Sequence, residues 1–285
     1  MFKKPIIPLS LIALIAIGGI YMYSKKAPSG TKPEQDAVNQ VAENEVRNDA
    51  DAFNHILKMA SGRVEQTVLD SVALIQKEVT STDKVQQAEA YKKLGDVWSR
   101  SGNIICGGHY YTEKAKITNT AADWRFAAGL LFYAAGGAAD SIAKSYAIDL
   151  AINGFNSALA LDSTDVDSKV QLAVCLIDGK NRVMDGVTML KQVEKIQPDH
   201  EYMNITLGRL AIVSGQFDKA IPRLKRLAEL HPDNLEAHYY LAEAYRASGD
   251  KVSSIQALEN AKKHFAKMPE AQKQIEELIQ NIKKS

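Results

Sequence analysis

Apolar residues recur every three or four positions through most of the chain after residue 60, which is the spacing of one buried face on an α-helix. The clearest run follows the Ser61-Gly62 pair and predicts an amphipathic helix on Val64, Val68, Val72, Ile75 and Val79. The Ser61-Gly62 pair is either the turn of a helical hairpin or a weak point in one long helix. This part of the chain, residues 34–87, is therefore expected to hold helices.

The C-terminal half matches itself when it is shifted by 34 residues. Pro198 and Pro232 are related by this shift, and Gly215 and Gly249 are related in the same way. Apolar triples recur at the same interval: Val187, Ile221 and Ile255, then Leu190, Leu224 and Leu258. A fixed period of this length indicates a stack of identical supersecondary units.

The period and its small residues resemble the tetratricopeptide repeat (TPR), in which each unit is a pair of antiparallel helices. The resemblance implies an all-α fold, an α-solenoid of stacked helix-turn-helix repeats. In the unit 201–234, Gly208 permits close contact between the helices, Gly215 ends the first helix, Ala220 is the small residue of the second helix and Pro232 closes the unit. The array is expected to cover residues 88–268, with full repeats at 167–200, 201–234 and 235–268, degenerate repeats at 88–121 and 122–166, and a capping helix at 269–285.

The upstream units depart from the pattern in three places. The unit 167–200 has Gly186 as its small residue and no glycine at the turn. The unit 122–166 is several residues too long, and Gly136 and Gly137 mark the insertion. In the unit 88–121 the stretch NIICGGHYY is a poor second helix, so a bent glycine-rich loop is expected there.

The N-terminus contains an uncharged apolar run at residues 5–23, PIIPLSLIALIAIGGIYMY, between a short tail at 1–4 and a linker at 24–33. Nineteen helical residues cross most of a hydrocarbon core about 30 Å thick. A cleaved signal sequence is expected to end in small residues, whereas this run ends in bulky Tyr21, Met22 and Tyr23. We therefore expect one uncleaved transmembrane helix and a single-pass protein of the cell membrane, with the soluble part outside the cytoplasm, in the periplasm.

Composition and motifs argue against several classes of function. Thirty-five Lys and Arg residues against 34 Asp and Glu residues give a net charge of +1, so nucleic acid is not an expected partner. No phosphate-binding, hydrolase or zinc-protease motif occurs, and we expect no catalytic residue, no cofactor and no enzyme activity. Cys106 and His109 form a lone CxxH, which supplies too few ligands for a metal site, and Cys175 is expected to be a buried small apolar residue.

The repeat resemblance implies a partner-binding groove lined by the first helix of each unit. The residues predicted to line it are Tyr202, Ile205, Arg209, Ile212, Tyr239, Glu243 and Arg246. The alternative is that Tyr202, Ile205 and Tyr239 pack between neighbouring repeats.

The leading hypothesis for the function is a membrane-anchored scaffold or assembly factor that binds a protein or peptide. The alternative function is that of an accessory subunit of an envelope biogenesis enzyme complex, for cytochromes or cell wall. The sequence leaves open whether the chain forms homo-oligomers.

Overall fold

The computed structural model describes residues 49–284. The expected tail at 1–4, the transmembrane helix at 5–23, the linker at 24–33 and the first residues of the segment 34–87 lie outside the described residues. Within residues 49–284, no helix combines the length and the apolar character needed to cross a bilayer.

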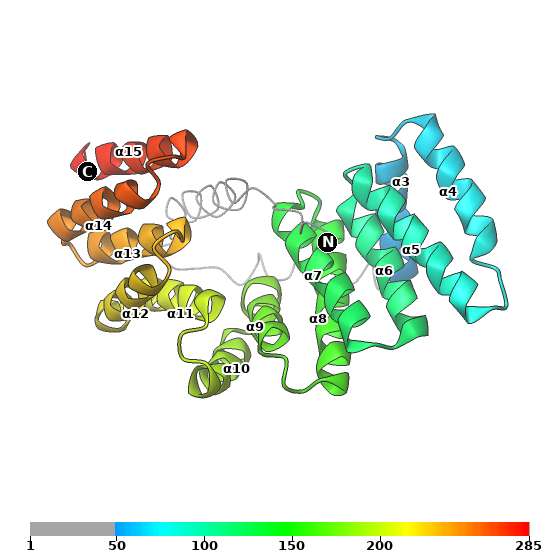
Figure 1. Ribbon diagram of the computed structural model, residues 1–285, viewed down its shortest axis with the longest axis horizontal. Coiled ribbons are helices and arrows are strands. Elements are labelled where there is room, and N and C mark those ends of the chain that lie inside the picture. Colours follow the sequence, from blue (N-terminus) through cyan, green and yellow to red (C-terminus); the bar gives the residue numbers. More distant parts are fainter. Residues whose placement is uncertain (1–48, 285) are drawn as a thin grey trace, which may run out of the picture. The chain divides into compact units, whose positions relative to one another are not determined.

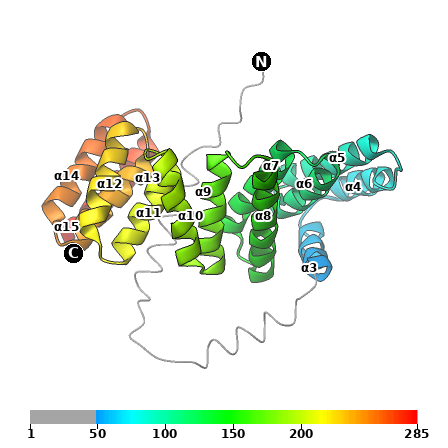
Figure 2. The same cartoon turned by 90° about the horizontal axis from the view of Figure 1, so that it is seen from below.

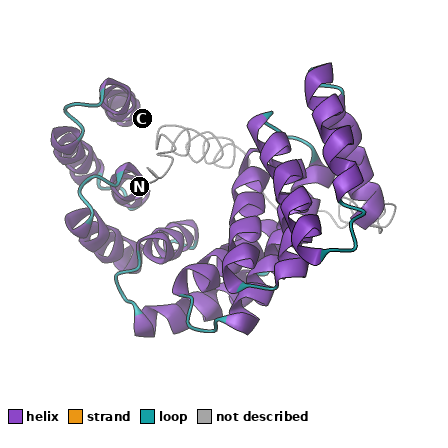
Figure 3. Ribbon diagram, turned by 45° about the vertical axis from the view of Figure 1, so that its right-hand side comes forward, coloured by secondary structure: helices purple, strands orange, loops and turns teal. Residues whose placement is uncertain are grey.

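All regular structure in the described residues is helical (Figure 3). Residues 49–189 and residues 190–284 form two compact units, and α10 crosses the boundary between them. The first unit contains α3 (Asp49–Ser61), α4 (Gln66–Glu78), α5 (Lys84–Arg100), α6 (Ile104–Thr118), α7 (Ala121–Gly137), α8 (Ser141–Leu161), α9 (Val166–Val174), a π-helical turn (Cys175–Gly179) and the start of α10 (Val183–Ile196). The second unit contains the end of α10, α11 (Glu201–Val213), α12 (Phe217–Leu230), α13 (Leu235–Ala247), α14 (Lys251–His264) and α15 (Pro269–Lys284).

The helices pack as consecutive antiparallel pairs. In the first unit α5 pairs with α6 and α7 pairs with α8, and these helices lie side by side (Figure 1). In the second unit α11 pairs with α12 and α13 pairs with α14, and the first helices α11 and α13 also contact each other (Figure 2). The predicted all-α helical-repeat fold is therefore confirmed for the described residues.

In the three full repeats, the turn after the first helix uses a left-handed backbone conformation at a fixed position. Gly215 and Gly249 have φ of 71° and 91°, which glycine adopts without steric cost. The unit 167–200 has no glycine at the equivalent position, but Asn181 stands there with φ 53°. Asparagine tolerates this conformation better than most residues, so the 34-residue register continues through the unit that lacks the glycine.

Small residues let the two helices of each pair approach closely. A Cβ atom on Gly208 would lie 2.6 Å from Leu224 Cδ2, and one on Gly186 would lie 2.5 Å from the carbonyl oxygen of Ala173. The residues equivalent to Gly186 in the next two units are Ala220 and Ser254, and both are fully buried. The close packing of the two helices in each pair therefore favours small residues at these positions.

The glycine-rich loop expected around Cys106 and His109 is wrong, because both residues lie inside α6. Glycine lowers helix propensity, but packing decides the outcome here. A Cβ atom on Gly107 would lie 2.1 Å from Ser99 Oγ, and one on Gly108 would lie 2.6 Å from Leu131 Cγ. Both glycines are thus contact points of α6 with its neighbours.

The extra residues of the unit 122–166 extend its helices. α7 has 17 residues and α8 has 21, whereas α11 and α12 have 13 and 14. The chain turns directly after Gly137, where α7 ends.

The Ser61-Gly62 pair separates α3 from α4, but the two helices do not form a hairpin. α3 packs against α6 and α8, whereas α4 packs against α5. The amphipathic helix predicted after residue 62 is confirmed, because α4 buries Val72 and packs Ile75 against the same core.

Each unit has its own core. The core of the second unit includes α15, whose Ile275 and Ile279 are fully buried. Several first helices begin at a residue whose side chain accepts a backbone N–H bond, as Asp83 does for α5 and Asn234 for α13. These caps and cores fix the first helices that carry the predicted binding residues.

Candidate partner-binding surface and polar pocket

The packing of α11 against α13 brings most of the predicted binding residues onto neighbouring helices. Tyr202 and Arg209 lie on α11 and are half-buried. Glu243 and Arg246 lie on α13, are half-buried as well, and form an ion pair in which Arg246 Nε is 2.8 Å from Glu243 Oε2. We call Tyr202, Arg209, Glu236, Tyr239, Glu243 and Arg246 the first-helix surface.

The apolar members of the prediction are largely packing residues. Ile205 is only 4% exposed and belongs to the core of the second unit, so its side chain is removed from the surface that a partner contacts. Ile212 and Tyr239 are partly buried against the same core. The ring of Tyr239 meets that of Tyr240 edge-on at 5.2 Å, and burial raises the pKa of Tyr239 to about 12.

The carboxylate of Glu236, which the same first-helix spacing places on this surface, links the two helices electrostatically. Burial raises the pKa of Glu236 on α13, whereas the positive charge of Arg209 on α11 lowers it and Glu201 raises it further. Glu236 is therefore a partly dehydrated acid that faces a cation from the preceding repeat.

A pocket of about 460 Å³ lies elsewhere in the second unit, among α10, α11 and α12. Its walls combine charged side chains with apolar ones, namely Glu194, Pro198, Asp199, Asn204, Lys219, Pro222, Arg223, Arg226, Leu227 and Leu230. None of these residues was predicted as a site residue.

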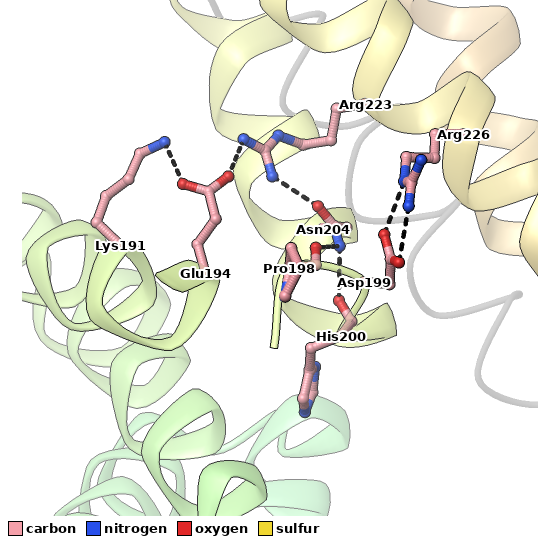
Figure 4. A network of polar contacts seen from close by, with 8 residues as sticks. All are labelled: Lys191, Glu194, Pro198, Asp199, His200, Asn204, Arg223 and Arg226. Carbon is pink, nitrogen blue, oxygen red and sulfur yellow. Dashed lines mark hydrogen bonds and ion pairs between the residues drawn. The ribbon is translucent and has the colours of Figure 1, made fainter. Parts of the chain in front are cut away.

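Several of the lining residues belong to one polar network (Figure 4). Arg223 donates to Asn204 Oδ1 at 2.6 Å and also pairs with Glu194. Asn204 Nδ2 donates to the carbonyl oxygens of Pro198 at 2.8 Å and His200 at 3.0 Å. The network therefore connects the second helix of one repeat, the loop after it and both helices of the next repeat.

The charges in the network are matched in pairs. Arg226 binds Asp199 with two hydrogen bonds, at 2.7 and 2.8 Å, and this pairing lowers the pKa of Asp199. Burial raises the pKa of Glu194, but hydrogen bonds from Lys191 and Arg223 lower it more. Arg223 and Arg226 therefore each have a carboxylate partner within the fold.

The CxxH pair is a packing feature of the first unit. Burial raises the pKa of the Cys106 thiol to about 12 and lowers the pKa of His109 to about 4. His109 Nδ1 lies 2.7 Å from the hydroxyl of Tyr146. Residues 49–284 contain no group of three or more side chains placed to hold a metal ion. Cys175 is 1% exposed, as expected for a buried small apolar residue.

Comparison with known proteins gives matches of two kinds. A family model described as a tetratricopeptide repeat matches residues 205–269. A tetratricopeptide repeat protein from Parabacteroides merdae has a similar structure with a TM-score of 0.50 and 14% identity, over 81% of this chain and 97% of that one. A comparison with curated proteins gave no match.

Two further solved structures are similar at lower scores. MamA has a TM-score of 0.46 and 17% identity over 63% of this chain and 92% of that one. YrrB, described as a TPR protein with an unusual peptide-binding site, has a TM-score of 0.44 and 14% identity over 69% of this chain and 95% of that one. The described residues have an all-α helical-repeat fold similar to that of the tetratricopeptide repeat protein from Parabacteroides merdae, and residues 205–269 match the model of that repeat.

Proposed function

We propose that this chain is a membrane-anchored scaffold that binds a protein or peptide partner on its first-helix surface. Residues 5–23 hold it in the membrane as a single span, and the repeat body lies on the extracytoplasmic side. The partner belongs to an assembly process in the cell envelope. The observation that carries the binding proposal is the packing of α11 against α13, which sets Arg209 beside Glu236.

The residue types of the first-helix surface support partner binding. Tyrosine and arginine contribute a large share of the binding energy at protein interfaces, and this surface has two of each. They lie on helices fixed by a buried core, so little conformational entropy is lost when a partner binds.

The charges of the surface favour a partner of mixed charge. The charge of Arg209 on α11 acts on Glu236 on α13, and Arg246 on α13 pairs with Glu243 on the same helix. A uniformly acidic or basic ligand would meet like charges here, which costs binding free energy. The partner is therefore a protein segment that carries both acidic and basic side chains.

Photocrosslinking in the full-length chain tests this proposal. A photoreactive residue replaces Tyr202 at the start of α11, and in a matched control it replaces Val252, which is 78% exposed on the second helix α14. We expect a defined protein adduct in membranes from position 202 and none from position 252. The same adducts from both positions, or an adduct from position 252 alone, would overturn the assignment of the surface.

A further inference from the structure

The polar pocket among α10, α11 and α12 is built mainly from second helices and the loop between two repeats. Of the described residues that line it, Asn204 alone comes from a first helix, and none belongs to the first-helix surface. Its volume of about 460 Å³ lies within the range of roughly 300–1,000 Å³ that is typical of small-molecule sites. The pocket is therefore large enough for a small ligand and shares no residue with the first-helix surface.

The charged residues of the pocket do not follow the 34-residue period. Five of the lining residues are charged, namely Glu194, Asp199, Lys219, Arg223 and Arg226. One repeat further on, Asp233 alone keeps a charge, and the other equivalent residues are Ala228, Ser253, Ala257 and Asn260. The next junction of the same fold thus lacks most of these charges.

The repeat fold does not require the ion pair of Glu194 and Arg223. The equivalent residues at the next junction are Ala228 and Ala257, and both of these are buried. The side chains of Arg223 and Glu194 are 19% and 27% exposed. Replacing a largely buried ion pair by apolar residues is often neutral or stabilising. Packing of the repeats therefore gives no reason for charges at this junction.

The other lining residues are mainly apolar, and one of them also departs from the repeat. Pro222 lies inside α12, where a proline cannot donate the helical hydrogen bond to the carbonyl oxygen of Asp218. The equivalent residues of the neighbouring units are Thr188 and Gln256, which both have this N–H group. Leu230, the last residue of α12, is 48% exposed. Pro222 and Leu230 thus supply apolar contacts for a ligand that the helical repeat itself does not require.

The hydrogen-bonding groups that remain available in the pocket are donors. Both oxygens of Asp199 accept from Arg226. The two oxygens of Glu194 accept from Arg223 and from Lys191 (Figure 4). Each guanidinium donates two hydrogen bonds in this network, which leaves further N–H groups on both arginines without an acceptor among the described residues. The pocket therefore favours a ligand that accepts hydrogen bonds.

The charge of the pocket favours an anion with a single charge. Three cations against two carboxylates leave the lining residues with a net charge of +1. Arg223 and Arg226 each pair with a carboxylate. Lys219 carries the surplus charge, because its ammonium group donates to the neutral side-chain amide of Gln216, at 2.6 Å. A carboxylate carries one negative charge, whereas a phosphate monoester carries about −1.5 to −2 charges. One carboxylate therefore matches the pocket.

We propose that this pocket binds a small organic acid that has one carboxylate and an apolar body. The carboxylate pairs with Lys219 and accepts hydrogen bonds from the remaining guanidinium N–H groups, and the apolar body packs against Pro222 and Leu230. The C-terminal end of a polypeptide fits less well, because its backbone N–H groups require acceptors and the oxygens of both carboxylates are already engaged. The proposal does not depend on the first-helix surface, so failure of one leaves the other standing.

A defined acid tests the proposal. The probe is fluorinated phenylbutyrate, a soluble monocarboxylate whose phenyl group and short chain form the apolar body. Its matched controls are the corresponding amide, which has no charge, and the corresponding amine, which has the opposite charge. Binding to the full-length chain in lipid nanodiscs is measured by fluorine NMR of each compound, with empty nanodiscs as the blank. We expect the acid to bind, and the amide and the amine to bind at least about tenfold more weakly.

Three variants locate the binding. Lys219→Gln removes the surplus charge, and Leu230→Gln removes an apolar contact. Each is expected to weaken binding of the acid about tenfold. The matched control is Lys225→Gln, because Lys225 carries the same charge on the same helix but does not line the pocket, and it leaves binding unchanged. All three positions are exposed, so the melting temperature should stay the same.

Equal binding of the acid, the amide and the amine overturns the proposal, and so does an equal effect of Lys219→Gln and Lys225→Gln. The last compound is a short peptide that ends in phenylalanine with a free carboxylate. If this peptide binds more tightly than the acid and loses the difference when its carboxylate is amidated, the proposal is also overturned, because the pocket then holds the end of a polypeptide.

Discussion

The ring of Phe53 on α3 stacks on the imidazole of His109 on α6, with 3.5 Å between the ring centroids. This contact holds α3 on the repeat body, together with the burial of Ile56 and Ala60. It also covers His109, whose imidazole would be better solvated in the unfolded chain. The stability of the first unit therefore depends on keeping His109 neutral.

We predict that acidification destabilises the first unit through His109. Burial, with a smaller contribution from Lys116, lowers its pKa to about 4 in the fold, whereas the unfolded value is about 6.5. The stabilising contribution is thus fully present above pH 6.5 and is lost as the pH falls towards 4. From pH 7 to pH 5 the loss is about 2 kcal/mol, measured by urea unfolding. The variant His109→Gln should show a smaller loss, and an equal loss in both proteins would refute the assignment.

Removal of the Asn204 side chain should destabilise the second unit. Asn204→Ala leaves the carbonyl oxygen of Pro198 and one Arg223 nitrogen without their partner, and an unsatisfied buried group costs about 1–3 kcal/mol. The urea midpoint of the full-length chain measures this loss. The control is Asn260→Ala at an exposed position of α14, where the change should stay within about 0.5 kcal/mol. Equal effects would mean that the network adds no stability.

Two glycine substitutions should change the free energy of unfolding in opposite directions. In Gly208→Ala the new methyl group meets Leu224, and overpacking of this kind costs about 1–3 kcal/mol. In Gly136→Ala it meets no atom within 4 Å, so the higher helix propensity should stabilise by up to about 1 kcal/mol. Thermal unfolding distinguishes them, and a loss of stability in both would show that Gly136 is also a packing residue.

The membrane proposal has its own test. If residues 5–23 span the bilayer, alkaline carbonate should leave the full-length chain in the membrane pellet, whereas a chain that starts at Lys32 should be released. Release of the full-length chain, or a mature N-terminus near Ala27, would contradict the anchor.

The sequence predicted those features of the fold that repeat in register. The turn at Gly215 was visible because the left-handed backbone conformation selects glycine, and the position recurs at Gly249. The helix α6 was missed because Gly107 and Gly108 have low helix propensity, and the contacts that require them come from Ser99 and Leu131 on other helices. Propensity is local, whereas these contacts are tertiary.

The site was predicted only in part for the same reason. The spacing of the first helices placed Arg209 and Arg246 on adjacent helices. It did not show whether the Ile205 side chain is exposed in the groove or buried, and in the structure it is buried. The pairing of Glu194 with Arg223 joins residues 29 positions apart and leaves no pattern in the sequence. Such a pair is visible only once the helices are packed.

The central claim is that a partner binds the first-helix surface, and two arginines test it most directly. Arg246 on α13 and Arg226 on the second helix α12 are both paired with a carboxylate in the fold. The affinity of the partner identified by crosslinking is measured for the full-length Arg246→Ala and Arg226→Ala variants, together with their melting temperatures. We expect Arg246→Ala to weaken binding by about 2 kcal/mol, roughly 30-fold, while Arg226→Ala binds as the parent chain does and neither variant melts appreciably earlier. Equal affinities for the two variants, or weaker binding only in Arg226→Ala, would contradict the account.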